Sequence, residues 1–178
     1  MGLDAFYVGK LKGIGPVWQL TGCDTRTRWT VAELIIGRPT SQVAATFLDL
    51  LTDRLATVGI IVSGVVVDGG PEWKAAFRTR AASRGIDVHQ TPPRSPNHNG
   101  ICERVQGTLL DEFYRPTFHR GVVSDVALLN RQLQAHLHRH NTRRRNHGNW
   151  MAGRTPHQVL TSDQQRAELS PEPVACTL

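Results

Sequence analysis

Three acidic side chains occupy positions from which carboxylates could hold metal ions against a substrate. Asp68 follows the apolar run 65–67 and precedes two glycines, so it ends an expected strand, where open α/β sheets place ligands. Asp4 stands inside an expected strand, although aspartate is disfavoured there. Glu103 lies in the first turn of an expected helix. Carboxylate oxygens are the ligands that Mg²⁺ prefers, and a few of them can hold two ions about 3.5–4 Å apart that act on a phosphodiester.

Each of these acids also has an explanation that involves no chemistry. Asp68 begins an Asp-Gly pair of the kind that forms turns. Asp4 lies close enough to the amino terminus to belong to a frayed end. Glu103 would stabilise the helix dipole, an effect of about 0.3–1 kcal/mol. Asp24 follows a second apolar stretch and competes with Asp4 for the first position, so the residues alone leave the choice open.

The elements that must position these acids follow from the alternation of apolar and turn residues. The predicted strands, of which the first two form a hairpin, are 3–8, 17–24, 29–36, 65–67 and 87–89. The predicted helices, the last with Ser124 as its N-cap, are 41–57, 72–84, 101–113 and 124–140. A loop over 91–100, rich in proline and asparagine, precedes Glu103. This order predicts an α/β protein with one mixed sheet.

The positive charge of the chain is concentrated in one segment. The net charge is +6, from 21 basic and 15 acidic residues. The segment 119–154 contains seven arginines and a single acid, Asp125, so the rest of the chain is balanced. A basic cluster on an otherwise neutral domain indicates a polyanionic partner, although a solvated charged helix has the same composition. Arg143, Arg144 and Arg145 either contact phosphates or face water, and the charge of the segment favours phosphates.

Composition excludes several other classes of protein. The three cysteines are widely spaced and form no Cys-x-x-Cys pair, so neither a zinc knuckle nor a disulfide framework is expected. The longest apolar run, 58–67, is too short to cross a membrane, and the first ten residues lack the apolar stretch of a signal peptide. We therefore expect a cytoplasmic protein with no membrane partner.

Three histidines alternate along the last predicted helix. His136 and His140 are four residues apart, a spacing that can bind zinc. No third ligand has a matching spacing. We therefore expect His136, His138 and His140 to lie on a solvated basic face toward the polyanion.

The motifs around the acids resemble the integrase core family, that is, the retroviral-integrase-like DDE transposases of bacterial insertion sequences. In this family a first Asp lies in the first strand, a second ends the fourth strand, and a Glu follows 35 residues later, which is the separation of Asp68 and Glu103. Five ordered stretches match the family's motifs: 4–13, 24–29, 68–73, 95–104, and 141–144 together with 153–156. The resemblance covers about 4–160 of the chain.

The resemblance implies a fold, a reaction and a set of residues. The fold is RNase H-like, a five-stranded mixed sheet flanked by helices, with residues 1–160 as the catalytic core and 161–178 as a poorly ordered polar tail. The reaction is metal-dependent DNA strand cleavage and strand transfer, with Asp4, Asp68 and Glu103 holding two Mg²⁺ or Mn²⁺ ions and Asp24 serving as a turn residue. The implied DNA-binding residues are Asn97, His98, Asn99, Arg104, Arg143, Arg144, Arg145 and Arg154. Element ends and target DNA are the implied partners, bound by a homo-oligomer.

The sequence departs from the family pattern in several places, and two alternative functions remain to be considered. Gly69 replaces the usual Asn, and Thr27 stands where Ser is common. The chain begins three residues before Asp4, whereas family members carry a helix-turn-helix region upstream. This favours as an alternative a truncated, inactive remnant that binds DNA or dimerises. A repair nuclease of RNase H type is a second alternative, which the arginine-rich closing motif fits poorly.

Overall fold

A five-stranded sheet forms the centre of the protein in a computed structural model, which describes residues 1–92 and 100–169. Its strand order is β3-β2-β1-β4-β5. The strands are β1 (Gly2–Leu11), β2 (Gly15–Cys23), β3 (Thr30–Ile36), β4 (Gly64–Val67) and β5 (Asp87–Gln90). The first three form an antiparallel meander, whereas β4 pairs in parallel with both β1 and β5. This is the mixed sheet that the sequence predicts.

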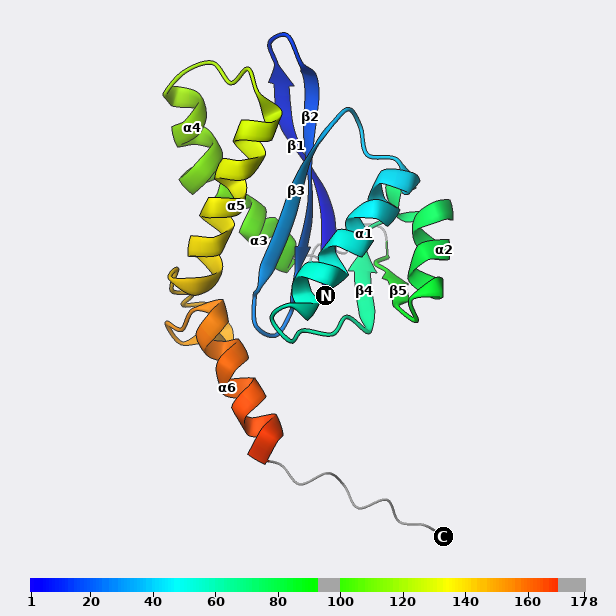
Figure 1. Cartoon of the computed structure of the whole chain (residues 1–178), viewed down its shortest axis with the longest axis vertical. Helices are drawn as coiled ribbons and strands as arrows, with labels where there is room; N and C mark the ends of the chain where they lie inside the picture. Colours follow the sequence, from blue (N-terminus) through cyan, green and yellow to red (C-terminus); the bar gives the residue numbers. More distant parts are fainter. Residues whose placement is uncertain (93–99, 170–178) are drawn as a thin grey trace.

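Helices cover both faces of the sheet (Figure 1). They are α1 (Ser41–Ala56), η1 (Pro71–Trp73), α2 (Ala75–Ser83), α3 (Gly100–Leu109), the π-helical turn η3 (Leu110–Tyr114), α4 (Arg115–His119), α5 (Val126–Thr142), η4 (Asn149–Met151) and α6 (Pro156–Leu169). α1 and α2 lie on one face, and α3 and α5 lie on the other. Two apolar cores result, one on each side of the sheet.

The alternation of side chains along β1 divides its residues between these two cores. Leu3 and Ala5 pack into the core beneath α1, whereas Phe6 and Val8 pack into the core beneath α3 and α5. Successive residues of a strand point to opposite faces. Asp4 therefore belongs to the face that α3 covers.

A glycine lets α1 approach the sheet closely. A Cβ atom on Gly22 of β2 would lie 2.7 Å from Leu51 Cδ1 of α1 and 3.1 Å from Leu3 Cδ2. Both leucines are fully buried. The apolar stripe of α1 therefore packs directly on the sheet. The helix begins after the N-cap Thr40, whose side chain accepts a hydrogen bond from the Val43 amide.

Two predicted helices differ from the structure in their limits. The helix expected over 72–84 is divided, because Lys74 is extended between η1 and α2. This break buries Trp73 against Phe77, with their ring centroids 5.1 Å apart. The N-cap of α5 is Asp125 rather than Ser124, since its carboxylate accepts from the Leu128 amide at 3.1 Å.

The carboxyl-terminal boundary predicted at residue 160 falls inside a helix. Residues 161–169, which we expected to belong to a poorly ordered tail, continue α6. Gln164 donates to the Val58 carbonyl at 2.9 Å, and Asp163 accepts two hydrogen bonds from Arg26. These contacts attach the polar helix to the domain. Within the described ranges, no helix has the length and apolarity that crossing a bilayer requires.

Two glycine substitutions should change stability in opposite directions. Gly22→Ala should lower the free energy of unfolding by about 1–3 kcal/mol, because the added methyl overpacks the contact with Leu51. Gly107→Ala should raise it by about 0.5–1 kcal/mol, because this exposed helical glycine has no described atom within 4 Å of an added Cβ. Urea unfolding measures both, and changes of the same sign would contradict the close approach of α1.

Candidate active site

The parallel pairing of β1 with β4 brings the first two acids level with each other. Gly2 of β1 is the register partner of Val66 of β4. Asp4 and Asp68 each lie two residues further along in the same direction. Val65 and Val67 point into the core beneath α1, so Val66 and Asp68 face the other side, as Asp4 does. The two aspartates therefore lie on one face of adjacent strands, at the carboxyl end of β4.

Helix α3 carries the third acid across this same face. Cys102, Val105 and Leu109 are buried beneath the helix against β1 and β2. Their spacing leaves Glu103 exposed at the first turn of α3. Gln106, one turn after Glu103, is buried. The apolar stripe of α3 thus fixes the position of an acid that is not itself part of the stripe.

The three carboxylates interact electrostatically. Burial raises the pKa of Asp4 to about 6, and repulsion from Asp68 and, to a smaller extent, from Glu103 contributes to the increase. The Ala5 amide, which donates to Asp4 Oδ1 at 2.8 Å, and the nearby Gln106 amide both lower the pKa. Gln106 Nε2 is buried and makes no hydrogen bond to a described residue. It is therefore a free donor near the Asp4 carboxyl group.

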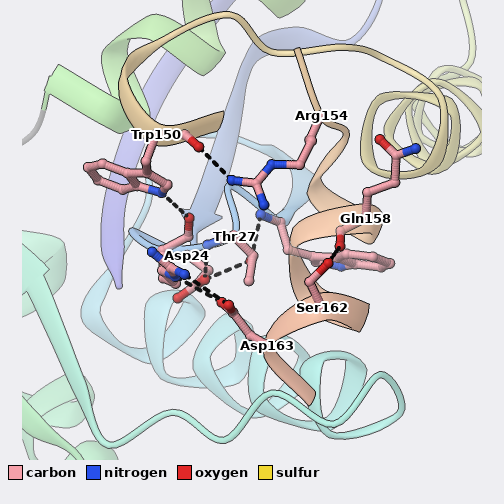
Figure 2. A network of polar contacts seen from close by, with 9 residues as sticks. Asp24, Thr27, Trp150, Arg154, Gln158, Ser162 and Asp163 are labelled. Atoms are coloured by element: carbon pink, nitrogen blue, oxygen red, sulfur yellow. Dashed lines mark hydrogen bonds and ion pairs between the residues drawn. The ribbon is translucent and has the colours of Figure 1, made fainter. Parts of the chain in front are cut away.

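Asp24 is engaged in a turn instead. Its carboxylate accepts hydrogen bonds from the Thr27 amide and the Thr27 hydroxyl, both at 2.7 Å. Its carbonyl accepts from the Arg28 amide at 3.0 Å. Figure 2 shows this turn between Trp150 and Asp163. Both hydrogen bonds end on Oδ2, so one oxygen of the Asp24 carboxylate is engaged within its own turn.

The chemistry of the donors fits a hard divalent cation, because the three coupled groups present only carboxylate oxygens. As the side chains stand, no group of three His, Cys, Asp or Glu residues in the described parts of the chain is arranged to hold a metal ion. Part of the reason is local. Asp68 turns back to accept from the Gly70 amide at 2.9 Å, and Asp4 accepts from Ala5. Ligation requires these carboxylates to rotate toward one another.

The arginines expected to bind DNA have different surroundings. Arg104, Arg143 and Arg145 are exposed. Arg144 forms a two-pronged ion pair with Glu112, with its Nη2 atom 2.7 Å from Oε1. Arg154 donates to the carbonyls of two residues of the preceding turn, Met151 and Trp150. Asn97, His98 and Asn99 lie outside the described residues.

The expectation of a solvated histidine face is wrong for two of the three histidines. His136 and His140 are buried, and desolvation lowers the pKa of both, to about 4 for His140. Only His138 of the three is exposed. The reason is helical geometry. The apolar stripe of α5 at Leu133 and Leu137 faces the sheet, and His136 and His140 lie immediately beside it.

Sequence reasoning missed two residues at this site. Gln106 could have been found from its position three residues after Glu103, on a neighbouring part of the same helical face. Arg28 gave no such signal, because a basic residue in a turn predicts exposure. It is instead only 8% exposed, with a backbone φ of 66°.

Comparisons with known proteins agree with this geometry. Residues 84–152, which include Glu103 and most of the basic segment, match the family model described as Integrase core domain. A chain of the simian T-cell lymphotropic virus intasome, solved in complex with PP2A regulatory subunit B56 gamma, superposes with a TM-score of 0.72 at 22% identity, over 99% of this chain and 58% of that one. The catalytic core domain of BIV integrase superposes with a TM-score of 0.64 at 17% identity, over 94% and 96% of the two chains. No curated protein sequence matches the chain.

The sheet order, the flanking helices and the family match agree on one architecture. The chain spans about 58% of the length of the intasome chain and almost the whole length of the BIV catalytic core. The fold is RNase H-like, as the resemblance implied. The chain therefore has the fold of integrase catalytic cores, and residues 84–152 match the family model described as Integrase core domain.

Proposed function

We propose that this chain is the catalytic core of a DNA transposase or integrase that cleaves and joins strands by metal-dependent phosphoryl transfer. The observation that carries the proposal is the placement of three acids from three different elements: Asp4 and Asp68 lie level with each other on one face of adjacent strands, and α3 carries Glu103 across that face. Carboxylates that are brought together on one face of adjacent interior strands repel one another, which is costly in folding. Such an arrangement is typical of a functional site rather than of a structural one.

The roles of the residues follow from their surroundings. Asp4, Asp68 and Glu103 would hold two divalent ions, Mg²⁺ or Mn²⁺. When bound, these ions would supply Lewis-acid polarisation of the phosphodiester and a nucleophile at neutral pH. Gln106, whose buried Nε2 has no hydrogen-bond partner among the described residues, would orient the Asp4 carboxyl through its side-chain amide. Arg104, exposed on α3 next to Glu103, would contact a DNA phosphate.

The partners proposed are element ends and target DNA, bound by more than one copy of the chain. Exposed arginines at the end of α5 support a polyanionic partner. The second candidate function, a DNA-binding or dimerising remnant without catalysis, has the same basic surface. It is favoured by the present orientation of Asp68, whose carboxylate bonds within its own turn. A measurement of strand cleavage distinguishes these two candidate functions.

Removing one carboxylate should abolish strand cleavage without preventing DNA binding. Asp68→Asn and Glu103→Gln keep side-chain shape but remove a ligand charge, so a bound ion loses several kcal/mol of transition-state stabilisation. The expected loss is roughly a thousandfold or more in rate. The measurement is cleavage and strand joining on labelled oligonucleotides with Mg²⁺ or Mn²⁺.

Asp87→Asn is the matched control, because Asp87 is an exposed carboxylate at the opposite end of a parallel strand. It should retain activity. Activity that persists in Glu103→Gln would contradict the three-carboxylate mechanism. A wild-type core that binds DNA but remains inert, even when fused to a DNA-binding region, would favour the remnant.

The raised pKa of Asp4 predicts a pH dependence of stability in EDTA. The folded state holds this proton up to about pH 6, whereas the ordinary pKa is 3.8. Stability from this group is therefore lost as pH rises from about 4 to about 6, about 3 kcal/mol in total. His140 has a lowered pKa and acts with the opposite sign over a similar window.

The difference between wild type and Asp4→Asn isolates the contribution of Asp4. Urea unfolding from pH 4 to pH 8 should show the variant gaining relative stability up to about pH 6 and then a constant difference. Asp87→Asn should follow the wild type. A difference that does not vary with pH would mean that Asp4 is not held in this electrostatic environment.

The arginines after α5 should contribute unequally to DNA binding. Arg143→Ala and Arg145→Ala should each reduce the slope of log affinity against log salt by about 0.9, the value for one phosphate contact. Arg144→Ala should reduce it less, because Glu112 already compensates that charge. Filter binding or fluorescence anisotropy at several salt concentrations measures the slopes. An equal or larger effect of Arg144 would contradict this ranking.

A further inference from the structure

A pocket of about 670 Å³ opens beside Glu103. It lies between α3 and the segment that follows α5, and its lining includes Arg28 from the β2–β3 turn. The basic residues on its wall are Arg28, Arg104, His140 and Arg144. Among the described lining residues Glu103 is the one acid. His140, whose pKa is lowered to about 4, is neutral at pH 7, and Arg144 is paired with Glu112. Arg28 and Arg104 therefore leave the pocket with an excess of positive charge over Glu103. An excess of this kind favours an anionic occupant.

Arg28 is buried at this pocket in a strained conformation. Its side chain is 8% exposed, and its backbone has a φ of 66°, which residues other than glycine rarely adopt. The guanidinium carbon lies 4.7 Å from the centre of the Trp150 ring, within cation–π distance. Nη1 is buried and has no hydrogen-bond partner in the described parts of the chain. A buried donor of a charged group left unpaired costs free energy, which an anionic ligand would recover.

His140 supplies a second unpaired nitrogen on the same wall. It is 5% exposed, and its Nδ1 atom makes no hydrogen bond to a described residue. A neutral imidazole with its proton on Nδ1 is a donor. Arg28 and His140 come from segments more than a hundred residues apart, so the fold alone brings these two incomplete groups to one pocket.

The turn that carries Arg28 is held on several sides. Asp24 closes it from within through its bonds to Thr27. Trp150 Nε1 donates to the Arg26 carbonyl at 3.0 Å, and the Arg26 side chain pairs with Asp163 of α6 (Figure 2). These contacts fix the backbone of the turn, and the Trp150 ring holds the guanidinium of Arg28. A binding group that is fixed in advance loses little conformational entropy when it binds.

We propose that this pocket binds a phosphodiester of the DNA backbone, with Arg28 as its principal ligand and His140 and Arg144 beside it. The inference rests on the proposed function and adds a fixed phosphate position next to Glu103. A cavity of about 670 Å³ is much larger than one phosphate ion and admits neighbouring nucleotide atoms. This favours a phosphate within a DNA strand over free phosphate.

The test is DNA binding in EDTA, where strand cleavage does not interfere. Arg28→Gln should weaken binding of a duplex oligonucleotide about tenfold, the loss expected for one charge-assisted hydrogen bond. The slope of log affinity against log salt should fall by about 0.9. A series of duplexes, each with a single neutral methylphosphonate, should contain one position that weakens the wild type but not Arg28→Gln.

Two further variants keep the test decisive. Thr108→Glu places a carboxylate on the exposed side of the pocket without altering Arg28, and it should weaken binding even where Arg28→Gln fails to fold. Arg80→Gln removes the same charge from α2, on the opposite face of the sheet, and should bind as the wild type does. Melting curves confirm that each variant is folded.

The outcomes separate the two proposals. In one outcome the wild type binds DNA, and the folded variants Arg28→Gln and Thr108→Glu have the same affinity, the same salt dependence of affinity and the same methylphosphonate profile. This outcome overturns the pocket assignment but not the proposed function. A wild type without measurable DNA affinity overturns both. Titration with inorganic phosphate identifies a free anion: saturable binding at Arg28 that DNA does not displace would overturn the assignment to a DNA phosphate.

Discussion

The parallel pairing of β1 with β4 is the constraint on which the site depends. One register, Gly2 opposite Val66, places Asp4 level with Asp68 and sends both side chains to the same face. A shift of one residue would turn one aspartate into the apolar core beneath α1. The fully buried Leu3 makes such a shift costly, because it would bring a leucine to the site and a carboxyl group into the core.

The helices on the site face are positioned by polar contacts as well as by apolar packing. Asn141, near the end of α5, receives a hydrogen bond from the Thr30 amide at 3.0 Å and donates to the Thr30 carbonyl at 2.8 Å. On α3, burial of Cys102 and Leu109 fixes the helix, so that Glu103 is left at the surface. The acids themselves contribute repulsion rather than stability. The surrounding framework must therefore hold them together.

The β2–β3 turn connects this framework with the carboxyl-terminal segment. Trp150 and α6 contact the same turn, and Arg28 points from it toward the face where Glu103 lies. The strained backbone of Arg28 persists because bonds on both sides determine it. The turn therefore links two segments that are far apart in the sequence to one side of the site.

The sequence by itself determined the five strands and their mixed sheet, because these depend on local periodicity and turn residues, and its resemblance to a family singled out Asp4, Asp68 and Glu103 as candidate site residues. The tertiary structure alone decided which groups are buried or paired. It placed His140 inside the domain, joined Arg144 to Glu112, and set Arg28 at a pocket. The physical reason is that burial and pairing arise from contacts between segments distant in the chain. Charge and helical spacing on a single segment do not contain this information.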